Sequence, residues 1–231
     1  MPPAKNKPAS AEKSDDARRL ARRERRRERS REEILEAARE VLLRKGVAAT
    51  TLEAVAREVG VTKPALYYYF PSKDALLFEL IFGAFEHHAQ AVHDEVERAE
   101  DGPQALRALI RETVDVFAPH LDDFRLAFLY GQVTSAGSLH FNPEQFARIR
   151  PLNDLCLAGA AEKLDHDRKK RPDSAAVEPR LMAFLAYLSA IGLLTMKGMV
   201  ESVGDPLLYS DDQLVDGFAK IFEVAADAMT S

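Results

Sequence analysis

Residues 50–77 read TTLEAVAREVGVTKPALYYYFPSKDALL, and this stretch decides the fold. The threonines at its start precede apolar residues at helical spacing and are suited to cap a short helix. Gly60 breaks that pattern, and Thr62 caps a second short helix that Pro71 ends. A longer helix is expected over 73–98. Before this stretch, Ile34, Leu35, Ala38, Val41 and Leu42 form one stripe of an amphipathic helix that Gly46 ends. Two short helices joined by a tight glycine turn, with this earlier helix bracing them, are the helix-turn-helix arrangement.

The second short helix carries three adjacent tyrosines, which cannot all face the same way. Leu66 and Phe70 are four residues apart and form a stripe that should face the core. Lys63 and Tyr67 share the opposite face, and Tyr68 lies on the adjacent strip. Because the second helix of a helix-turn-helix enters the major groove, the outward hydroxyls are expected to donate to phosphates.

Other side chains near this helix suit contacts with DNA. Lysine donates to guanine O6 and N7, so Lys63 is the best candidate for a base contact. Ala65 and the ring of Pro64 are small and apolar, which suits a thymine methyl group. Lys73 starts the longer helix beside free backbone N–H groups, and together they predict a phosphate clamp.

For two residues in this region, a purely structural role is an alternative to a DNA contact. Tyr69 is as suited to brace the helix against its neighbours as to touch DNA. Thr51 either contacts DNA or only caps its helix.

A basic arm precedes the helix-turn-helix. Residues 1–31 hold 12 Lys/Arg and 5 Asp/Glu, a net charge of +7, whereas the remaining 200 residues hold 20 and 32, a net charge of −12. Residues 32–75 carry a net charge of −1, so the long-range attraction for DNA must come from the arm. Residues 1–29 are predicted to be a disordered arm, although 18–31 is also compatible with a solvated helical extension.

The arginines of this arm, Arg18 to Arg31, are expected to lie along the DNA backbone or to enter the minor groove, as basic arms do. The contacts predicted within it are Arg25, Arg26, Arg27 and Arg29. A tail that only increases solubility is the alternative.

Residues 34–77 resemble the DNA-binding domain of the TetR family of transcriptional regulators. The matching features are Gly46, Thr51, Val55 and Ala56, Gly60 and Val61, Leu66 to Tyr68, Phe70, Lys73, Leu76 and Leu77. The resemblance implies an all-α homodimer whose divergent C-terminal domain binds a ligand, and which usually represses transcription until a small molecule binds. It also implies phosphate contacts from Tyr67, Tyr68 and Lys73, and groove contacts from Thr62, Lys63 and Pro64. Leu43 departs from the family, which more often has phenylalanine there.

The rest of the chain is predicted to be helical throughout. Glycine, proline and asparagine turn signals separate helices near 103–118, 121–134, 143–167, 178–202 and 211–229, and no segment alternates with period two. The predicted fold class is therefore all-α with about nine helices. It comprises a three-helix helix-turn-helix DNA-binding domain at 30–77 and a ligand-binding and dimerisation domain at 78–231.

The last two helices are predicted to form a dimer interface. The run 181–200 is apolar nearly all round, and the last helix has apolar residues at near-heptad spacing. The residues expected at the interface are Leu188, Ile191, Thr195, Leu214, Phe218, Ile221, Phe222 and Ala225. The uncharged run 181–196 is shorter than the roughly 20 residues of a membrane span, so a helix buried in protein, without a membrane partner, is expected.

Aromatic residues of the C-terminal part predict an apolar ligand pocket. Its candidates are Phe85, His88, Phe117, His120, Phe124, Phe128, Phe184 and Tyr187. A dry core is the alternative for the phenylalanines and Tyr187, and a surface position or an already satisfied side chain is the alternative for the two histidines. Cys156, the single cysteine, is expected to be buried and inert. No histidine spacing suggests a metal site, and no cofactor is predicted.

The leading functional hypothesis is a cytoplasmic, ligand-responsive transcriptional repressor. It binds a near-palindromic double-stranded DNA operator as a homodimer and is released by a small, largely apolar effector. A constitutive DNA-binding or architectural protein without an effector is the alternative, and a cavity of several hundred Å³ separates the two. An enzyme is not predicted, because the sequence offers no acid/base pair, no nucleophile with its base and no phosphate-binding loop. The sequence specifies neither the effector nor the operator, nor whether transcription is repressed or activated.

Overall fold

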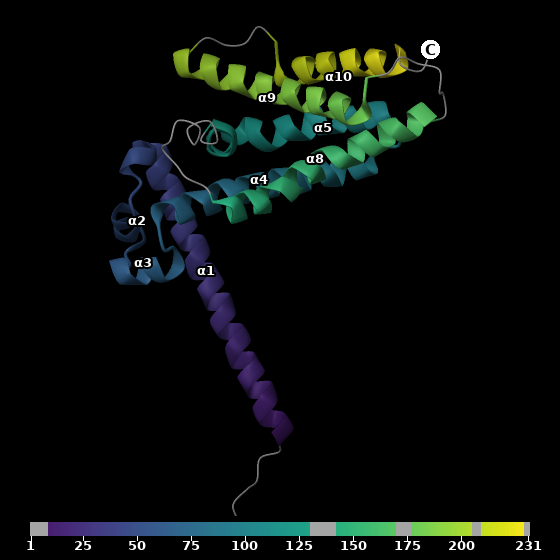
Figure 1. The fold of residues 1–231 in the computed structure, drawn as a ribbon. Coiled ribbons are helices and arrows are strands. Elements are labelled where there is room, and N and C mark those ends of the chain that lie inside the picture. Colours follow the sequence, from purple (N-terminus) through teal and green to yellow (C-terminus); the bar gives the residue numbers. More distant parts are fainter. Residues whose placement is uncertain (1–8, 130–141, 170–176, 205–208, 229–231) are drawn as a thin grey trace, which may run out of the picture. The chain divides into compact units, whose positions relative to one another are not determined.

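The structure is a computed structural model (Figure 1), and it describes residues 9–129, 142–169, 177–204 and 209–228. Every regular element in these ranges is helical, so the predicted all-α class is confirmed. Residues 1–79 and 80–231 form two compact units.

The first unit is built around a small helical core. Its elements are α1 (Ala9–Ala49), α2 (Leu52–Val59), α3 (Lys63–Tyr69) and the first turns of α4 (Lys73–Arg98). Their buried apolar side chains are Ile34, Ala38, Val41, Leu42, Leu52, Val55, Ala56, Leu66, Phe70, Leu76, Leu77 and Phe78. Burial of these stripes holds helices that are too short to be stable alone.

Turn chemistry sets where these helices begin and end. The Thr51 hydroxyl accepts a hydrogen bond from the Ala54 amide at 3.1 Å, which caps α2. Gly60 ends α2 with a φ of 75°, a left-handed conformation that glycine adopts without a Cβ clash. Gly46 has a φ of 76° and a ψ of 172° and kinks α1 near its end.

The basic arm is helical where the structure describes it. α1 begins at Ala9, so the expectation of a disordered arm is corrected for residues 9–29. Arginine, alanine, leucine and glutamate are strong helix formers, and the packed part of α1 already supplies the nucleus that an isolated helix lacks. Arg31 and Glu28, three residues apart, lie 3.5 Å from each other as an ion pair along this helix.

The second unit is a bundle in which α5 is central. α5 (Gly102–Phe117) packs against α8 (Pro143–Lys169), α9 (Pro179–Val203) and α10 (Asp211–Ala228) (Figure 1). A short turn, Ala118–His120, leads to α6 (Leu121–Phe124) and a wider helical turn, Arg125–Leu129. These elements cover the start of the predicted helix 121–134, whose residues 130–134 lie outside the described residues.

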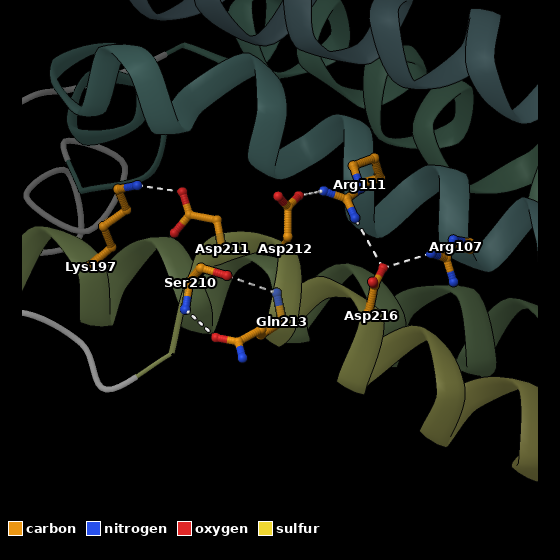
Figure 2. Close-up of polar contacts among 8 residues, drawn as sticks. All are labelled: Arg107, Arg111, Lys197, Ser210, Asp211, Asp212, Gln213 and Asp216. Carbon is orange, nitrogen blue, oxygen red and sulfur yellow. Dashed lines mark hydrogen bonds and ion pairs between the residues drawn. The ribbon is translucent and has the colours of Figure 1, made fainter.

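Charged side chains fasten α10 to the rest of this unit (Figure 2). From α5, Arg107 reaches Asp216 at 2.6 Å, and Arg111 reaches the same carboxylate at 3.0 Å. Arg111 also pairs with Asp212. At the start of α10, Ser210 and Gln213 exchange hydrogen bonds of 3.0 and 3.3 Å, which is a capping box. Lys197 of α9 pairs with Asp211 in the same first turn.

Candidate functional site

The second helix of the predicted helix-turn-helix, α3, has one buried face and one exposed face. Thr62 caps it through a 3.4 Å hydrogen bond from the Ala65 amide, and Pro64 lies in its first turn, where no backbone donor is lost. Leu66 is fully buried, together with Phe70 at the end of the helix. The helix therefore has a fixed orientation, with its other face turned to solvent.

Tyr67 and Tyr68 lie on that exposed face, as the sequence predicts. Their side chains are 42% and 68% exposed, which leaves both hydroxyls available to a partner. Tyr69 is half-buried and packs edge-on against Tyr68, with the ring centroids 5.2 Å apart. This position supports the role of Tyr69 in bracing the helix, one of the two roles that the sequence allows.

Lys63, the predicted base contact, is exposed but already paired. Its ammonium forms an ion pair with Glu53 of α2 and lies 5.6 Å from the centroid of the Tyr67 ring. The hydrogen bond from Lys63 lowers the pKa of the Glu53 carboxyl, and the same bond raises the pKa of Lys63. Sequence reasoning missed Glu53, because its contact with Lys63 joins two helices ten residues apart.

Thr51, Pro64 and Ala65 also lie at the start of α2 or α3. Thr51 and Pro64 are exposed and Ala65 is half-buried. The hydroxyl oxygens of the two capping threonines accept hydrogen bonds from backbone amides, which leaves the hydroxyl proton to donate elsewhere. This surface thus combines hydroxyl donors, small apolar groups and one ammonium.

Lys73 occupies a different place from the one the sequence predicts. Its half-buried ammonium donates to the carbonyl oxygens of Val47 and Ala48, at the end of α1. The helix end there has carbonyls without helical partners, and a lysine satisfies them well. The Ser72 hydroxyl oxygen accepts a hydrogen bond from the Ala75 amide at 3.0 Å, which caps α4. The phosphate contact of Lys73 stays a prediction.

The arm contributes arginines next to α3. Arg27 lies over the ring of Tyr68, with the guanidinium carbon 5.5 Å from the ring centroid. Arg31 pairs with Glu79 and lies over Phe70. The other predicted arm contacts, Arg25, Arg26 and Arg29, are exposed. Arg27 thus connects the arm with the exposed face of the recognition helix.

In the second unit, six of the eight predicted pocket residues form one aromatic cluster. The members are Phe85, His88, Phe117, Phe124, Phe128 and Tyr187. Phe128 contacts every other member, with centroid separations of 5.1 to 6.1 Å. The other two predicted residues, His120 and Phe184, are exposed and lie outside the cluster.

A short polar chain runs through this cluster. His88 is fully buried, and its Nε2 lies 3.1 Å from the hydroxyl of Thr113, while Nδ1 lies 3.9 Å from the Cys156 sulfur. Burial, with a smaller contribution from the charge of His87, lowers the pKa of His88 to about 4. Burial also raises the pKa of the Cys156 thiol to about 12, which makes it a poor nucleophile.

The second unit also has an open cavity of about 760 Å³ at the first turn of α10. It is lined by Asp115, Ala118, Pro119, Lys197, Ser210, Asp211 and Asp212. No predicted pocket residue lines it, and five of its seven lining residues are polar or charged; Figure 2 shows four of these, Lys197, Ser210, Asp211 and Asp212. It differs in chemistry from the apolar pocket that the sequence predicts.

The predicted dimer residues divide between two faces. Leu214, Phe218, Phe222 and Ala225 are half-buried against the core of their own unit, and Ile191 packs against a neighbouring core cluster. The half-buried hydroxyl of Thr195 donates to the Ile191 carbonyl at 2.7 Å. Leu188 and Ile221 are exposed. The α10 seam therefore faces inward more than the heptad pattern predicts.

A stripe of exposed apolar side chains runs along α9. The α9 stripe is made of Leu181, Phe184, Leu185, Leu188, Met196, Met199 and Val203. The opposite face is buried in the unit, where Ala183, Ala186 and Ala190 lie beside the larger Met182, Leu193 and Leu194. Sequence reasoning expected the helix to be buried in protein on more than one side. The three alanines all lie on the buried side of the helix, and this is the signal that distinguishes the two faces.

Within the described residues, α9 is the helix that is long and apolar enough to cross a membrane. The segment Pro179–Val200 spans 22 residues, and 28% of its most apolar window is buried in the unit. The uncharged run 181–196 is shorter than a membrane span, but the apolar helix around it is long enough, so the length of the run does not exclude a membrane span. One such helix is weak evidence for a membrane, because core helices of bundles share its length and composition.

Comparison with known proteins places the first unit in a family. Residues 34–80 match the model of the bacterial regulatory proteins of the tetR family. The chain is 26% identical over 135 residues to the transcriptional activator FasR of Mycolicibacterium smegmatis, a match that covers 58% of each protein. It is 33% identical over 84 residues to the regulator EthR of the same species, covering 36% of this chain and 37% of EthR. The matches thus span less than two thirds of these relatives.

Solved structures resemble the fold over most of the chain. A TetR/AcrR-family regulator from Thermobifida fusca aligns with a TM-score of 0.63 at 22% identity, covering 84% of this chain and 96% of that one. The regulator FadR of Bacillus subtilis, solved with stearoyl-CoA, aligns with a TM-score of 0.59 at 17% identity, covering 85% and 97%. Residues 34–80 thus form a helix-turn-helix domain of the tetR family of bacterial regulatory proteins, and the all-α fold of the chain resembles solved regulators of that family.

Proposed function

We propose that this protein regulates transcription by binding a near-palindromic DNA operator as a homodimer. The observation that carries the proposal is the exposed face of α3, where Lys63, Tyr67 and Tyr68 are available while Leu66 and Phe70 anchor the helix. Phenol hydroxyls donate to phosphates and fix the register of a protein on the duplex. An ammonium at the start of the recognition helix has access to base edges in the major groove.

The α9 stripe supports the homodimer. Monomeric proteins rarely expose an apolar patch this long, and a two-fold partner covers it with the same residues from the second copy. A dimer brings two recognition helices to successive major-groove faces about 34–36 Å apart. For that reason the operator is expected to be a near-palindrome, and the protein to act in the cytoplasm, where the DNA is.

We further propose that a small, largely apolar effector releases the protein from DNA, so that it acts as a repressor. FadR of Bacillus subtilis was solved with stearoyl-CoA. In this chain, the aromatic cluster offers apolar walls, and His88, Thr113 and Tyr187 offer the few polar groups that orient a ligand. Release follows if the effector binds better to a dimer whose recognition helices no longer match the operator.

The packing of the cluster favours a second candidate function. Rings at centroid distances of 5.1 to 6.1 Å fill one another's space, as in a dry core. A protein with such a core binds DNA constitutively and needs no effector.

Selection from random duplexes tests the DNA-binding proposal. We expect one short near-palindrome to be enriched, and Tyr67→Phe and Tyr68→Phe each to weaken binding about three- to thirtyfold, since each removes a hydrogen bond to a phosphate. Melting temperatures should stay unchanged, because both hydroxyls are solvent-exposed. Enrichment of no sequence overturns the proposal.

A second experiment separates the effector-responsive protein from the constitutive one. Stearoyl-CoA and shorter acyl-CoAs are titrated against the protein bound to fluorescent operator, and release is followed by anisotropy. Release at micromolar concentration, with a rise in the melting temperature of the free protein, supports an effector. If no compound of the series changes either signal, the constitutive candidate is favoured.

A further inference from the structure

Glu53 lies on the surface that faces DNA in the proposed function, although no DNA contact is assigned to it. It is in the first turn of α2, and its side chain is 48% exposed. Its partner Lys63 is the first residue of α3, with a side chain that is 55% exposed. The two N-terminal turns that a helix-turn-helix presents to DNA are therefore joined by one ion pair.

An acidic side chain at this place is unexpected for an interface with a polyanion. A carboxylate near the duplex repels phosphates and displaces none of their counterions. Glu53 favours the start of α2 through the helix dipole, but that role does not require a contact with Lys63. Stability does not explain the contact either, because exposed ion pairs contribute little.

The hydrogen-bonding groups of the pair complement the edge of a G·C base pair. In the major groove, guanine presents the acceptors O6 and N7, and cytosine presents the N4 amino donor. Lys63 supplies N–H donors, and the Glu53 carboxylate supplies acceptors. The Tyr67 ring, 5.6 Å from the ammonium, keeps the Lys63 end group near the carboxylate on the exposed face.

We propose that Glu53 and Lys63 read sequence together, with Lys63 donating to a guanine and Glu53 accepting from the N4 amino group of a cytosine in the same or the next base pair. The inference rests on the proposed DNA-binding function and deepens it. On DNA the two side chains exchange their mutual contact for contacts with the bases. In the free protein, Lys63 and Glu53 satisfy each other's hydrogen-bonding groups. A DNA site without this guanine and cytosine offers no contacts that replace the ion pair, so binding there does not favour breaking it.

Single-base-pair variants of the selected operator test the inference. For the wild-type protein, replacing the cytosine read by Glu53 should weaken binding about tenfold, the effect of one base contact. Glu53→Ala should bind the parent and the substituted duplex within about a factor of two of each other. Lys63→Ala should relax the preference at the guanine instead.

Glu53→Gln provides the sharper outcome. A glutamine presents both an acceptor and a donor, the pattern that pairs with adenine N6 and N7. We expect the preference at this position to move from cytosine to adenine. A helix-dipole role or simple repulsion of phosphates predicts no such change of base.

Glu58→Gln is the matched control. Glu58 is exposed on the same helix and pairs with Arg44 at 2.8 Å, away from α3. Its loss of one negative charge should change binding to all duplexes by the same factor. If Glu53→Ala and Glu53→Gln also act uniformly on all duplexes while melting like wild type, the inference is overturned. A wild-type protein that prefers no sequence overturns the proposed function instead, so the two failures are distinguishable.

Discussion

The imidazole of His88 lies among aromatic rings, which offer it few hydrogen-bond partners. Phe117 is 4.9 Å away between ring centroids, and Tyr187 is 5.9 Å away. A charged imidazolium in this site loses its hydration and gains no carboxylate. The neutral form is therefore the one that the fold stabilises, through the Thr113 hydroxyl.

The protein should lose stability in acid because of His88. Its pKa is about 4 in the folded state, below the ordinary value of 6.5. The unfolded state therefore binds a proton first as the pH falls, and the free energy of unfolding decreases by about 1.4 kcal/mol per pH unit between pH 6.5 and 4. Urea unfolding at pH 7, 6 and 5 measures this slope. His88→Gln removes the titrating group, so its pH profile should be flatter; superimposable profiles contradict the assignment.

At the residue scale, the sequence predicted correctly which side chains of α3 face the core and which face solvent, because this depends on local spacing. The sides taken by Leu66, Tyr67 and Tyr68 follow from the helical period, and the structure places them as expected. The contacts of Lys73 and Glu53 were not predicted. Their partners are the end of α1 and the start of α3, and the tertiary packing that brings these together leaves no periodic trace in the sequence.

Among the elements, α1 combines a packed half with a basic extension. Its last residues contribute to the core of the first unit, while the residues that carry the arginines are almost all exposed. A helix holds its charges at fixed spacing, which a flexible tail does not. The sequence was compatible with both a disordered arm and a helical extension, because helix propensity alone does not decide whether a solvated helix persists.

Deletion of residues 1–29 should flatten the salt dependence of operator binding. Each phosphate contact contributes about −0.9 to the slope of log K against log[salt], so loss of four arginine contacts changes the slope by about 3 to 4. The shortened chain begins at Ser30, with Glu33 three residues later, which is a capping box for the remaining helix.

Titration at several salt concentrations gives the slope, and base preference should be retained. Replacement of Arg25, Arg26, Arg27 and Arg29 by lysine keeps the charge and is the control, with a slope close to wild type. An unchanged slope after deletion leaves only the solubility role for the arm.

The start of α5 lies unusually close to α8. A Cβ added to Gly102 meets Leu164 Cδ2 at 2.7 Å and the Leu164 Cα at 3.0 Å, and backbone atoms do not move aside easily. Gly102→Ala should therefore reduce the free energy of unfolding by about 1–3 kcal/mol.

Chemical denaturation measures this change. The control is Gly83→Ala in α4, where a Cβ meets nothing within 4 Å and a gain of about 0.5–1 kcal/mol is expected from the higher helix propensity of alanine. Equal effects of the two substitutions contradict the close contact with α8.

For the whole molecule, the sequence does not determine which apolar helix faces stay exposed to solvent within one protomer. The heptad pattern of the last helix predicts a seam with a partner, yet Phe218 and Phe222 pack against their own unit. The large side chains of the α9 stripe instead stay outside, whereas Met182, Leu193 and Leu194 pack inside with the alanines of the other face. Hydrophobic periodicity shows that a face is buried, but not whether the same chain or a second copy buries it.

The assembly proposed for this protein therefore depends on the α9 stripe. Leu188 lies midway along it and is 45% exposed. In a two-fold dimer this position meets the same stripe of the partner, and a glutamate there buries an uncompensated charge. Leu188→Glu is expected to weaken the dimer by about 3 kcal/mol or more, over a hundredfold in the dissociation constant.

Sedimentation velocity over a range of concentrations measures the assembly, and operators with one or two half-sites report its consequence. The glutamate variant should sediment as a monomer, bind a single half-site like wild type and lose the added affinity for the palindrome, because the two recognition helices are no longer linked. Leu188→Met keeps an apolar side chain of similar volume and should remain dimeric. A glutamate variant that stays dimeric and retains full palindrome affinity would show that the α9 stripe is not the interface and that a different face joins the two copies.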